Sequence, residues 1–208
     1  MIRHPRTTEE WKEVLQETTL EGVGAGNLVS SGYQLLIYPD SFLNKISEPV
    51  TEFDSELATI CEQMHVTMFY KRGLGLSAVQ VGLLQQIVTM KIPETITEDG
   101  KEYDVSRPYN FINPEIRESV TERFAFSEGC LSVPGYYEDR ERSNAILLRY
   151  QTIHGDVEIR WFEGLEAFVI QHEIDHLEGK IFVDKLSPLK KERVRKKIAK
   201  TIKWSKQK

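Results

Sequence analysis

The chain has 208 residues, of which 40% are hydrophobic and 28% charged, and its formal net charge is -5. That length suits one domain with a sizeable core, alone or with an appendage, but is short for two domains. No apolar run reaches the ~18 residues of a transmembrane helix. The first 21 residues hold five Glu against three basic residues, unlike a signal or transit peptide. We therefore expect a cytoplasmic protein that crosses no membrane.

The chain divides by composition into three parts. Residues 1–32 predict an N-terminal extension, with a short helix capped by Thr7 or Thr8 and a flexible Gly-rich loop over residues 21–32. Residues 33–187 form the main domain, and residues 188–208 predict a basic C-terminal helix. Cys61 and Cys130 are too few for a disulfide framework, as expected in a reducing compartment.

The first elements of the main domain follow from apolar patterning. Residues 35–38 are a short apolar run typical of a strand. Residues 54–72 predict a helix capped by Asp54 or Ser55, because one face gathers a buried stripe of Leu57, Ile60, Cys61, Met64 and Met68. Cys61 lies inside this stripe, so we interpret it as a packed core thiol.

Strand patterns follow the helix. Strand-like runs occupy residues 86–92 and 111–116, and residues 94–108 between them predict a polar loop. Two β-rich runs flank His154-Gly155-Asp156 and predict a hairpin over residues 145–162. The last element of the main domain is a helix from Gly164, which Gly179 ends.

This last helix carries His172-Glu173-Ile174-Asp175-His176. Imidazoles four residues apart lie on one helix face, so both can bind one divalent metal ion. Glu173 lies about 100° around the helix axis, where its carboxylate can reach a metal-bound water. The pattern favours metal-assisted hydrolysis, with a chance pair of histidines as the alternative.

A third ligand decides which kind of site this is. Many peptidases with this motif take that ligand from further along the chain, but Phe182 occupies the position where a third histidine would stand. Upstream, Cys130 lies in a polar, glycine-flanked turn, where a thiol can ionise and bind metal. A Cys, His and His set with one open position is typical of a catalytic metal site.

Three segments together resemble the signature motifs of the peptide deformylase family, in the family's order. They are Gly-Leu-Gly-Leu-Ser-Ala-Val-Gln over residues 73–80, Glu-Gly-Cys-Leu-Ser over 128–132 and Gln-His-Glu-Ile-Asp-His over 171–176. The resemblance covers roughly residues 33–200. It implies an α+β fold with antiparallel or mixed β-sheets packed around a central metal-binding helix, to which the residue patterns add an N-terminal helix and a basic C-terminal helix; the extension before Tyr33 is unlike most family members. Ser77 stands where Ala is commoner, and because both residues are small we expect little effect.

The resemblance implies a hydrolase of protein biosynthesis that removes the formyl group from the N-formylmethionine of nascent polypeptides and releases formate. It implies one divalent metal ion, Fe²⁺ in the cell with Zn²⁺, Ni²⁺ or Co²⁺ able to substitute, held by Cys130, His172 and His176. Glu173 would take a proton from water and later give it to the departing amine. The Gln80 amide and the Leu131 backbone N–H would stabilise the oxyanion.

Methionine specificity requires an apolar pocket beside the metal. Helix spacing places Leu165, Phe168 and Val169 in its lining, and the resemblance adds Leu74, Gly75 and Phe126. Plain core packing is the alternative for each of these residues except Gly75. Glu128 is expected to orient a metal ligand or to pair with Arg142.

The C-terminal segment is strongly basic. Residues 188–208 hold ten Lys or Arg and one Glu, a charge of +9, so the rest of the chain carries -14. This helix would place Leu189, Val194, Ile198 and Ile202 on one side. Such a charge run is often only a solvated face, but the resemblance favours ribosomal RNA near the nascent-chain exit as a partner. We expect a monomer.

Two rival functions remain. Another His-Glu-x-x-His hydrolase or peptidase is disfavoured by Phe182. A non-catalytic, ribosome-associated metal-binding module is disfavoured by Glu173 and Gln80, because a purely structural metal site needs neither residue.

Overall fold

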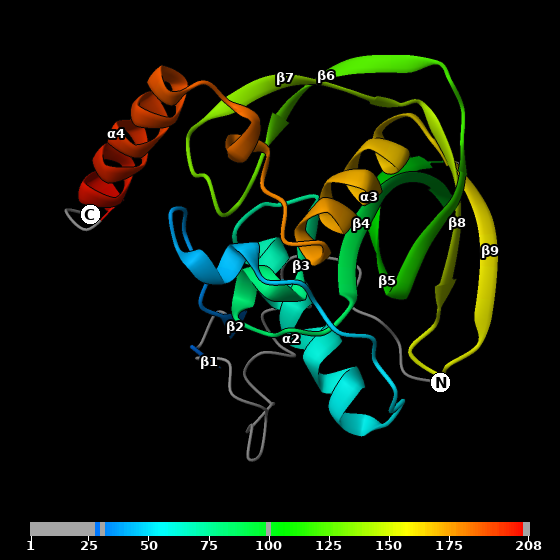
Figure 1. Ribbon diagram of the computed structural model, residues 1–208. Helices are drawn as coiled ribbons and strands as arrows, with labels where there is room; N and C mark the ends of the chain where they lie inside the picture. The colour runs from blue at the N-terminus through cyan, green and yellow to red at the C-terminus, as the bar shows by residue number, and fades with distance from the viewer. Residues whose placement is uncertain (1–27, 30–31, 99–100, 206–208) are drawn as a thin grey trace.

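Helix α3 (Gly164–Leu177) lies at the centre of the fold and carries both histidines of the motif (Figure 1). The structure, a computed structural model, describes residues 28–29, 32–98 and 101–205. A curved five-stranded sheet partly encloses α3. Its strands run in the order β3 (Gly75–Ser77), β4 (Ile87–Glu98), β5 (Lys101–Ser119), β8 (Ala145–Gln151) and β9 (Val157–Glu163), each antiparallel to its neighbours.

Strand β4 separates two parts of the core. Its successive side chains point to opposite faces of the sheet. Ile87 packs in the cluster of helix α2 (Ser55–Tyr70), whereas Val88 and Met90 pack in the cluster that contains Val169 and Ile170 of α3. The alternation therefore buries one helix against each face and fixes α3 relative to the sheet.

Several predictions from the sequence are confirmed. Helix α2 begins after Asp54, whose carboxylate accepts the N–H groups of Glu56 and Leu57, and all five residues of its predicted stripe are buried. Burial raises the pKa of the Cys61 thiol to about 12, as expected of a core cysteine. The β8–β9 hairpin forms across Gly155, and α3 ends before Gly179, whose φ is +71°. Mixed helices and antiparallel sheets give the predicted α+β class.

The predicted polar loop over residues 94–108 is wrong. Strands β4 and β5 pair through this region, from Ile87 with Ile112 to Glu98 with Lys101. The apolar run at residues 35–38 also forms no sheet strand. Instead, the N–H groups of Leu36 and Tyr38 donate to backbone oxygens of Gln80 and Ser132, at 2.8 and 2.9 Å. The run therefore ties two of the three motif segments together.

Two short strand pairs complete the sheets, β1 (Leu28–Val29) with β2 (Gly32–Tyr33) and β6 (Arg123–Gly129) with β7 (Tyr137–Ser143). Residues 28–29 thus pair with residues 32–33, and the other positions of the predicted Gly-rich loop lie outside the described residues. The predicted N-terminal helix lies outside the described residues. Single 3₁₀ turns span Ser41–Asn44, Ala78–Val81 and Phe182–Lys185.

The C-terminal helix α4 (Pro188–Ser205) projects at the edge of the molecule (Figure 1). Val194 and Ile198 are buried in a cluster with Val133, Phe182 and other residues, whereas Leu189 is 64% exposed. The apolar side of α4 is therefore only partly used in packing. Among the helices of the described residues, none is long and apolar enough to cross a bilayer.

Candidate active site

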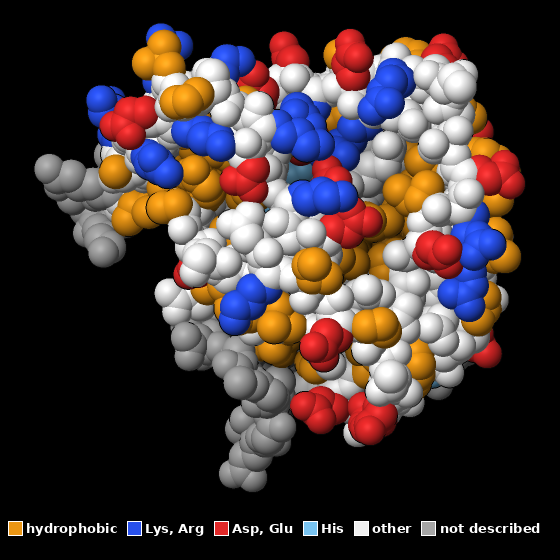
Figure 2. Space-filling view, viewed as in Figure 1, with side chains coloured by type: hydrophobic (Ala, Val, Ile, Leu, Met, Phe, Trp, Pro, Cys, Tyr) orange, Lys and Arg blue, Asp and Glu red, His pale blue; other side chains and the backbone are white. Residues whose placement is uncertain are grey.

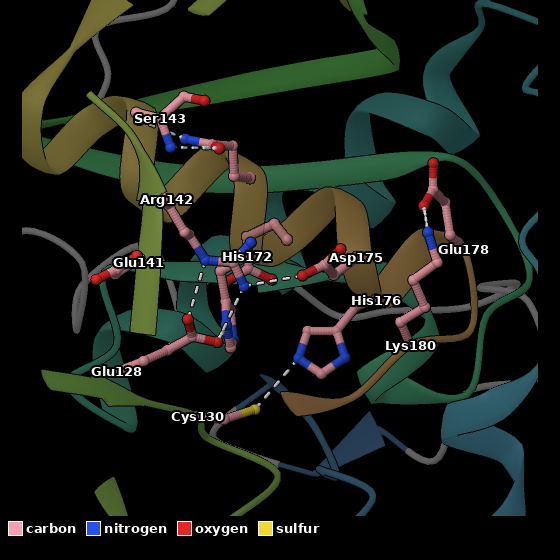
Figure 3. A network of polar contacts seen from close by, with 12 residues as sticks. Glu128, Cys130, Glu141, Arg142, Ser143, His172, Asp175, His176, Glu178 and Lys180 are labelled. Carbon is pink, nitrogen blue, oxygen red and sulfur yellow. Dashed lines mark hydrogen bonds and ion pairs between the residues drawn. The ribbon is translucent and has the colours of Figure 1, made fainter. Parts of the chain in front are cut away.

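The three predicted metal ligands converge although 46 positions separate Cys130 from His176. Cys130 directly follows strand β6, and α3 presents both imidazoles toward it. The Cys130 Sγ and His176 Nε2 atoms are 3.2 Å apart (Figure 3), and one ligand atom from each of the three residues lies within 4.8 Å of the others. One ion can therefore reach all three.

A buried carboxylate orients the first imidazole. Glu128 Oε1 is 2.6 Å from Nδ1 of His172, and the Arg142 guanidinium donates to both Glu128 oxygens at 2.9 and 3.1 Å (Figure 3). Arg142 also donates to Asp175 Oδ2 at 2.8 Å, which links β7 to α3. Burial alone would raise the pKa of Glu128, but hydrogen bonds from His172 and Arg142 outweigh burial and bring it to about 2. An ionised Glu128 holds the His172 ring with Nε2 available for metal.

The donor set fits a divalent cation. His176 is buried, burial lowers its pKa well below the usual value, and its Nδ1 has no hydrogen-bond partner among the described residues. Burial alone would lower the pKa of His172 as well, but contacts with Cys130 and Glu128 raise it well above the usual value. The anionic groups around His172 favour a positive charge beside that ring, which a metal ion supplies, and the neutral His176 imidazole has a nitrogen lone pair to offer the same ion. Sulfur and imidazole nitrogen are the ligands that Zn²⁺ and Fe²⁺ accept.

Glu173 lies beside the ligands and reaches the cavity. Its side chain is buried, and burial raises its pKa. Its Oε2 atom accepts a hydrogen bond of 2.6 Å from the Ser77 hydroxyl. A Cβ atom added at Gly75 would lie 2.5 Å from Glu173 Oε1 and 2.8 Å from Val169 Cγ1, so only glycine lets β3 approach α3 this closely.

Gln80 lies behind Cys130 and is only 1% exposed. Its Oε1 accepts the Ser77 backbone N–H at 2.8 Å, which leaves its amide nitrogen pointing toward the cysteine. Nε2 donates to Ser132 Oγ at 3.1 Å and approaches Cys130 Sγ at 3.4 Å. The amide donor is thus aimed at Cys130, one of the three candidate metal ligands, although Gln80 is not among the cavity-lining residues.

A cavity of about 590 Å³ opens beside Cys130, His172 and Glu173. Figure 2 shows orange apolar side chains in a hollow bordered by charged ones. The Phe126 and Phe168 rings pack with their centroids 4.6 Å apart. All six residues predicted for the substrate pocket line this cavity: Leu74, Gly75, Phe126, Leu165, Phe168 and Val169. Leu131 lines it as well, next in the chain to the thiol.

Three polar side chains of the site have no role predicted from the sequence: Ser77, Ser132 and Asp175. Each stands within a motif segment, which is the only signal that singles it out. Their contacts join segments that are distant along the chain, so residue spacing could not reveal them.

Phe182, which excluded a downstream ligand, is buried in the α4 cluster and stacks near Tyr136 with ring centroids 6.3 Å apart.

Comparison with known proteins agrees with this geometry. The family model of polypeptide deformylase matches residues 33–192. The peptide deformylase of Afipia carboxidovorans is 41% identical over 170 residues, covering 82% of this chain and 95% of the relative. The crystal structure of peptide deformylase from Ehrlichia chaffeensis has a TM-score of 0.74 and 38% identity, covering 82% of this chain and 97% of that one. The peptide deformylase structure from Legionella pneumophila has a TM-score of 0.72 and 37% identity over 84% of this chain and 98% of that one.

Motifs, fold and site point to the same chemistry, and the chain belongs to the polypeptide deformylase family, whose members are metal-dependent hydrolases that remove the formyl group from N-formylmethionyl peptides in protein biosynthesis.

Proposed function

We propose that Cys130, His172 and His176 hold one divalent metal ion and that Glu173 moves the protons of the deformylation reaction. The observation that carries this proposal is the convergence of the three ligand atoms within 4.8 Å, beside a buried carboxylate that faces the cavity. When bound, the ion supplies a Lewis acid that polarises the formyl carbonyl and lowers the pKa of a coordinated water.

The protein's own groups then act at defined atoms. Because the Ser77 hydroxyl engages Oε2 of Glu173, Oε1 is the atom that takes the proton from the attacking water. The same carboxyl group later protonates the nitrogen of the departing amine. The Gln80 amide and the Leu131 backbone N–H stabilise negative charge on the formyl oxygen, supported by the direction of Gln80 Nε2 toward Cys130. The buried Glu128 and Arg142 keep the His172 ring in place.

The substrate is the N-formylmethionyl end of a nascent peptide. Its methionine side chain is long, flexible and apolar, and it suits the aromatic and aliphatic wall formed by Phe126, Phe168 and Val169. The open rim, where Tyr137 is 65% exposed, leaves room for the following residues of the chain. An enzyme that acts on nascent peptides has to work in the compartment where they are synthesised, and we propose that this compartment is the cytoplasm. We also propose that the enzyme is a monomer.

We propose Fe²⁺ as the metal in the cell, with Zn²⁺, Ni²⁺ or Co²⁺ able to substitute. The mixed sulfur and nitrogen donor set accepts all four ions, so availability rather than affinity order selects among them. Metal analysis of enzyme purified without oxygen tests this: we expect about one iron per chain, and zinc alone after such a purification would contradict the choice of iron.

We further propose that α4 contacts ribosomal RNA. Lys and Arg side chains gather over α4 in Figure 2, and exposed Arg193, Lys196 and Lys200 form part of that surface. Removing the whole helix would be a poor test, because Val194 and Ile198 belong to a buried cluster and their loss would expose Phe182. Charge substitutions on the exposed side leave that packing intact.

The triple variant Arg193→Gln, Lys196→Gln, Lys200→Gln should weaken ribosome binding in a salt-dependent manner while sparing turnover of short formyl peptides. Each side chain that contacts a phosphate contributes about one unit to the slope of log K against log salt. The matched control replaces three exposed basic residues elsewhere, Lys45, Arg117 and Arg123, with Gln. Sedimentation with ribosomes at several salt concentrations measures the effect. Equal binding by the wild type and both triple variants would contradict the proposal.

A further inference from the structure

The mouth of the cavity carries two basic side chains, Lys71 and Arg72, which directly follow helix α2. We propose that these two residues select formyl peptides that carry an acidic side chain within the three residues after the methionine. The inference rests on the proposed function, and it adds a preference among the substrates of that function.

The positive charges at the mouth have no acidic partner in the protein. Of the residues that line the cavity, only Lys71 and Arg72 are both charged and exposed. The lining carboxylates, Glu128 and Glu173, lie deep in the site and are 2% and 3% exposed. No carboxylate of the described residues forms an ion pair with Lys71 or Arg72. Both cations are therefore available to a ligand.

These two charges stand out against the rest of the body. Residues 1–187 carry a net charge of -14, that is -5 minus the +9 of residues 188–208. A body of that sign repels acidic peptides and attracts basic ones. A basic pair at the cavity mouth reverses the sign of the field where the peptide enters. The enzyme can thus distinguish acidic from basic peptides at this point.

The backbone of Arg72 is held in place by the end of helix α2. The N–H groups of Arg72 and Gly73 donate to the backbone oxygens of Phe69 and Met68, at 3.0 and 2.9 Å. This is the Schellman pattern, and Arg72 takes its left-handed position with a φ of +58°, where glycine is the usual residue. The helix end therefore does not explain an arginine here, whereas a fixed backbone presents its side chain at the cavity mouth with little loss of entropy.

The distance from the reaction centre sets which residue of the peptide meets these charges. Gly75 of β3 packs against Glu173, the proposed proton carrier, and Arg72 precedes Gly75 by three positions. Strand β3 pairs on one side with β4, and residues 71–75 line the cavity. Extended chains advance by about 3.3 Å per residue, so a peptide that lies along this segment brings the second or third residue after its methionine to Arg72. The long side chains of Lys71 and Arg72 also cover the positions beside it.

The test compares kcat/KM for formate release from peptides derived from formyl-Met-Ala-Ala-Ala amide. Glu, Gln or Lys replaces each Ala in turn, and the C-terminal amide removes the terminal carboxylate. At the best position we expect Glu to exceed Gln by about 3- to 10-fold, the scale of one or two exposed ion pairs, and Lys to fall below Gln. The preference should appear in KM and should disappear at about 1 M salt, where the Debye length is only about 3 Å.

Three variants separate recognition from structure. Charge reversal in Lys71→Glu, Arg72→Glu should invert the order, so that Lys exceeds Gln and Gln exceeds Glu. Arg72→Gly should lower the ratio of Glu to Gln without lowering the melting temperature, because glycine suits the positive φ better. A merely structural Arg72 would give a lower melting temperature instead. The matched control, Lys45→Gln with Arg117→Gln, removes two exposed charges that do not line the cavity and should keep the wild-type ratio.

Equal kcat/KM for Glu and Gln peptides at all three positions in the wild type would overturn the inference. A ratio that survives charge reversal, or that falls equally in the control, would overturn it as well. Absence of formate from every peptide would instead overturn the proposed function. In that case the dissociation constants of the same peptides, measured by calorimetry, would still compare Glu with Gln and so decide whether Lys71 and Arg72 recognise acidic chains.

Discussion

Replacement of Glu173 by glutamine should lower kcat for formate release by about 10²- to 10⁴-fold, the range for a group that transfers protons in the transition state. Glutamine has the same shape and can still accept the Ser77 hydroxyl, so the side chain stays in place. It cannot take a proton from water at pH 7. Initial rates with formyl-Met-Ala-Ser and metal analysis of the same sample measure both consequences, and we expect about one metal ion per chain as in the wild type.

Glu178→Gln is the matched control for this prediction. Glu178 follows the same helix, but it is exposed and pairs with Lys180 rather than with the site. It should therefore keep the wild-type kcat. A Glu173→Gln enzyme within tenfold of the wild-type rate would exclude Glu173 as the proton carrier, and loss of its metal would make Glu173 a ligand instead.

Replacement of Cys130 by alanine should remove the bound metal and with it the formation of formate. Cys130 supplies the only sulfur of the site among the described residues, and two neutral imidazoles alone bind a divalent ion far more weakly. Metal analysis after dialysis, followed by the formate assay, gives both quantities. The variant should remain folded, because the Glu128–Arg142–Asp175 contacts that join β6, β7 and α3 do not involve the thiol.

The second cysteine provides the control. Cys61 is buried in the α2 stripe, so Cys61→Ala should lower the melting temperature while leaving metal content and kcat unchanged. If Cys130→Ala retained its metal and its activity, the thiol would not be a ligand. If both variants lost metal equally, the effect would be one of stability rather than of coordination.

The helices could be predicted because their signals are local. The stripe of α2 repeats at helical spacing over its whole length, and Asp54 marks its start with a side chain suited to a cap. The His172-Glu173-His176 spacing likewise placed three functional groups on one helix. A fold that buries this helix then brings the groups to one site.

The β4–β5 pairing was missed because its outer half carries charged and polar residues. Residues 94–98 and 102–105 nevertheless alternate and include Thr95, Ile96, Thr97 and Val105, which favour strands. The sequence has Asp-Gly at residues 99–100, between Glu98 of β4 and Lys101 of β5, which pair with each other. An Asp-Gly pair between two strand-like runs is a strong signal for a hairpin. These local strand and turn signals outweigh the polarity of the segment.

The remaining part of the site depends on tertiary structure. The approach of Cys130 to His176, and of Ser77 to Glu173 across 96 positions, results from packing β3 and β6 around α3. No local pattern fixes such distances. The motif resemblance pointed to these segments, but the contact of the Ser77 hydroxyl with Glu173 required coordinates.

The most direct measurement is formate released by the anaerobically purified, iron-loaded wild type from formyl-Met-Ala-Ser. We predict one formate for each new methionine amino group, with the Met–Ala bond intact. Formylmethionine and Ala-Ser without formate would point to a peptidase, and no product from the metal-loaded enzyme would identify a binding module. Either result would contradict deformylation by this site.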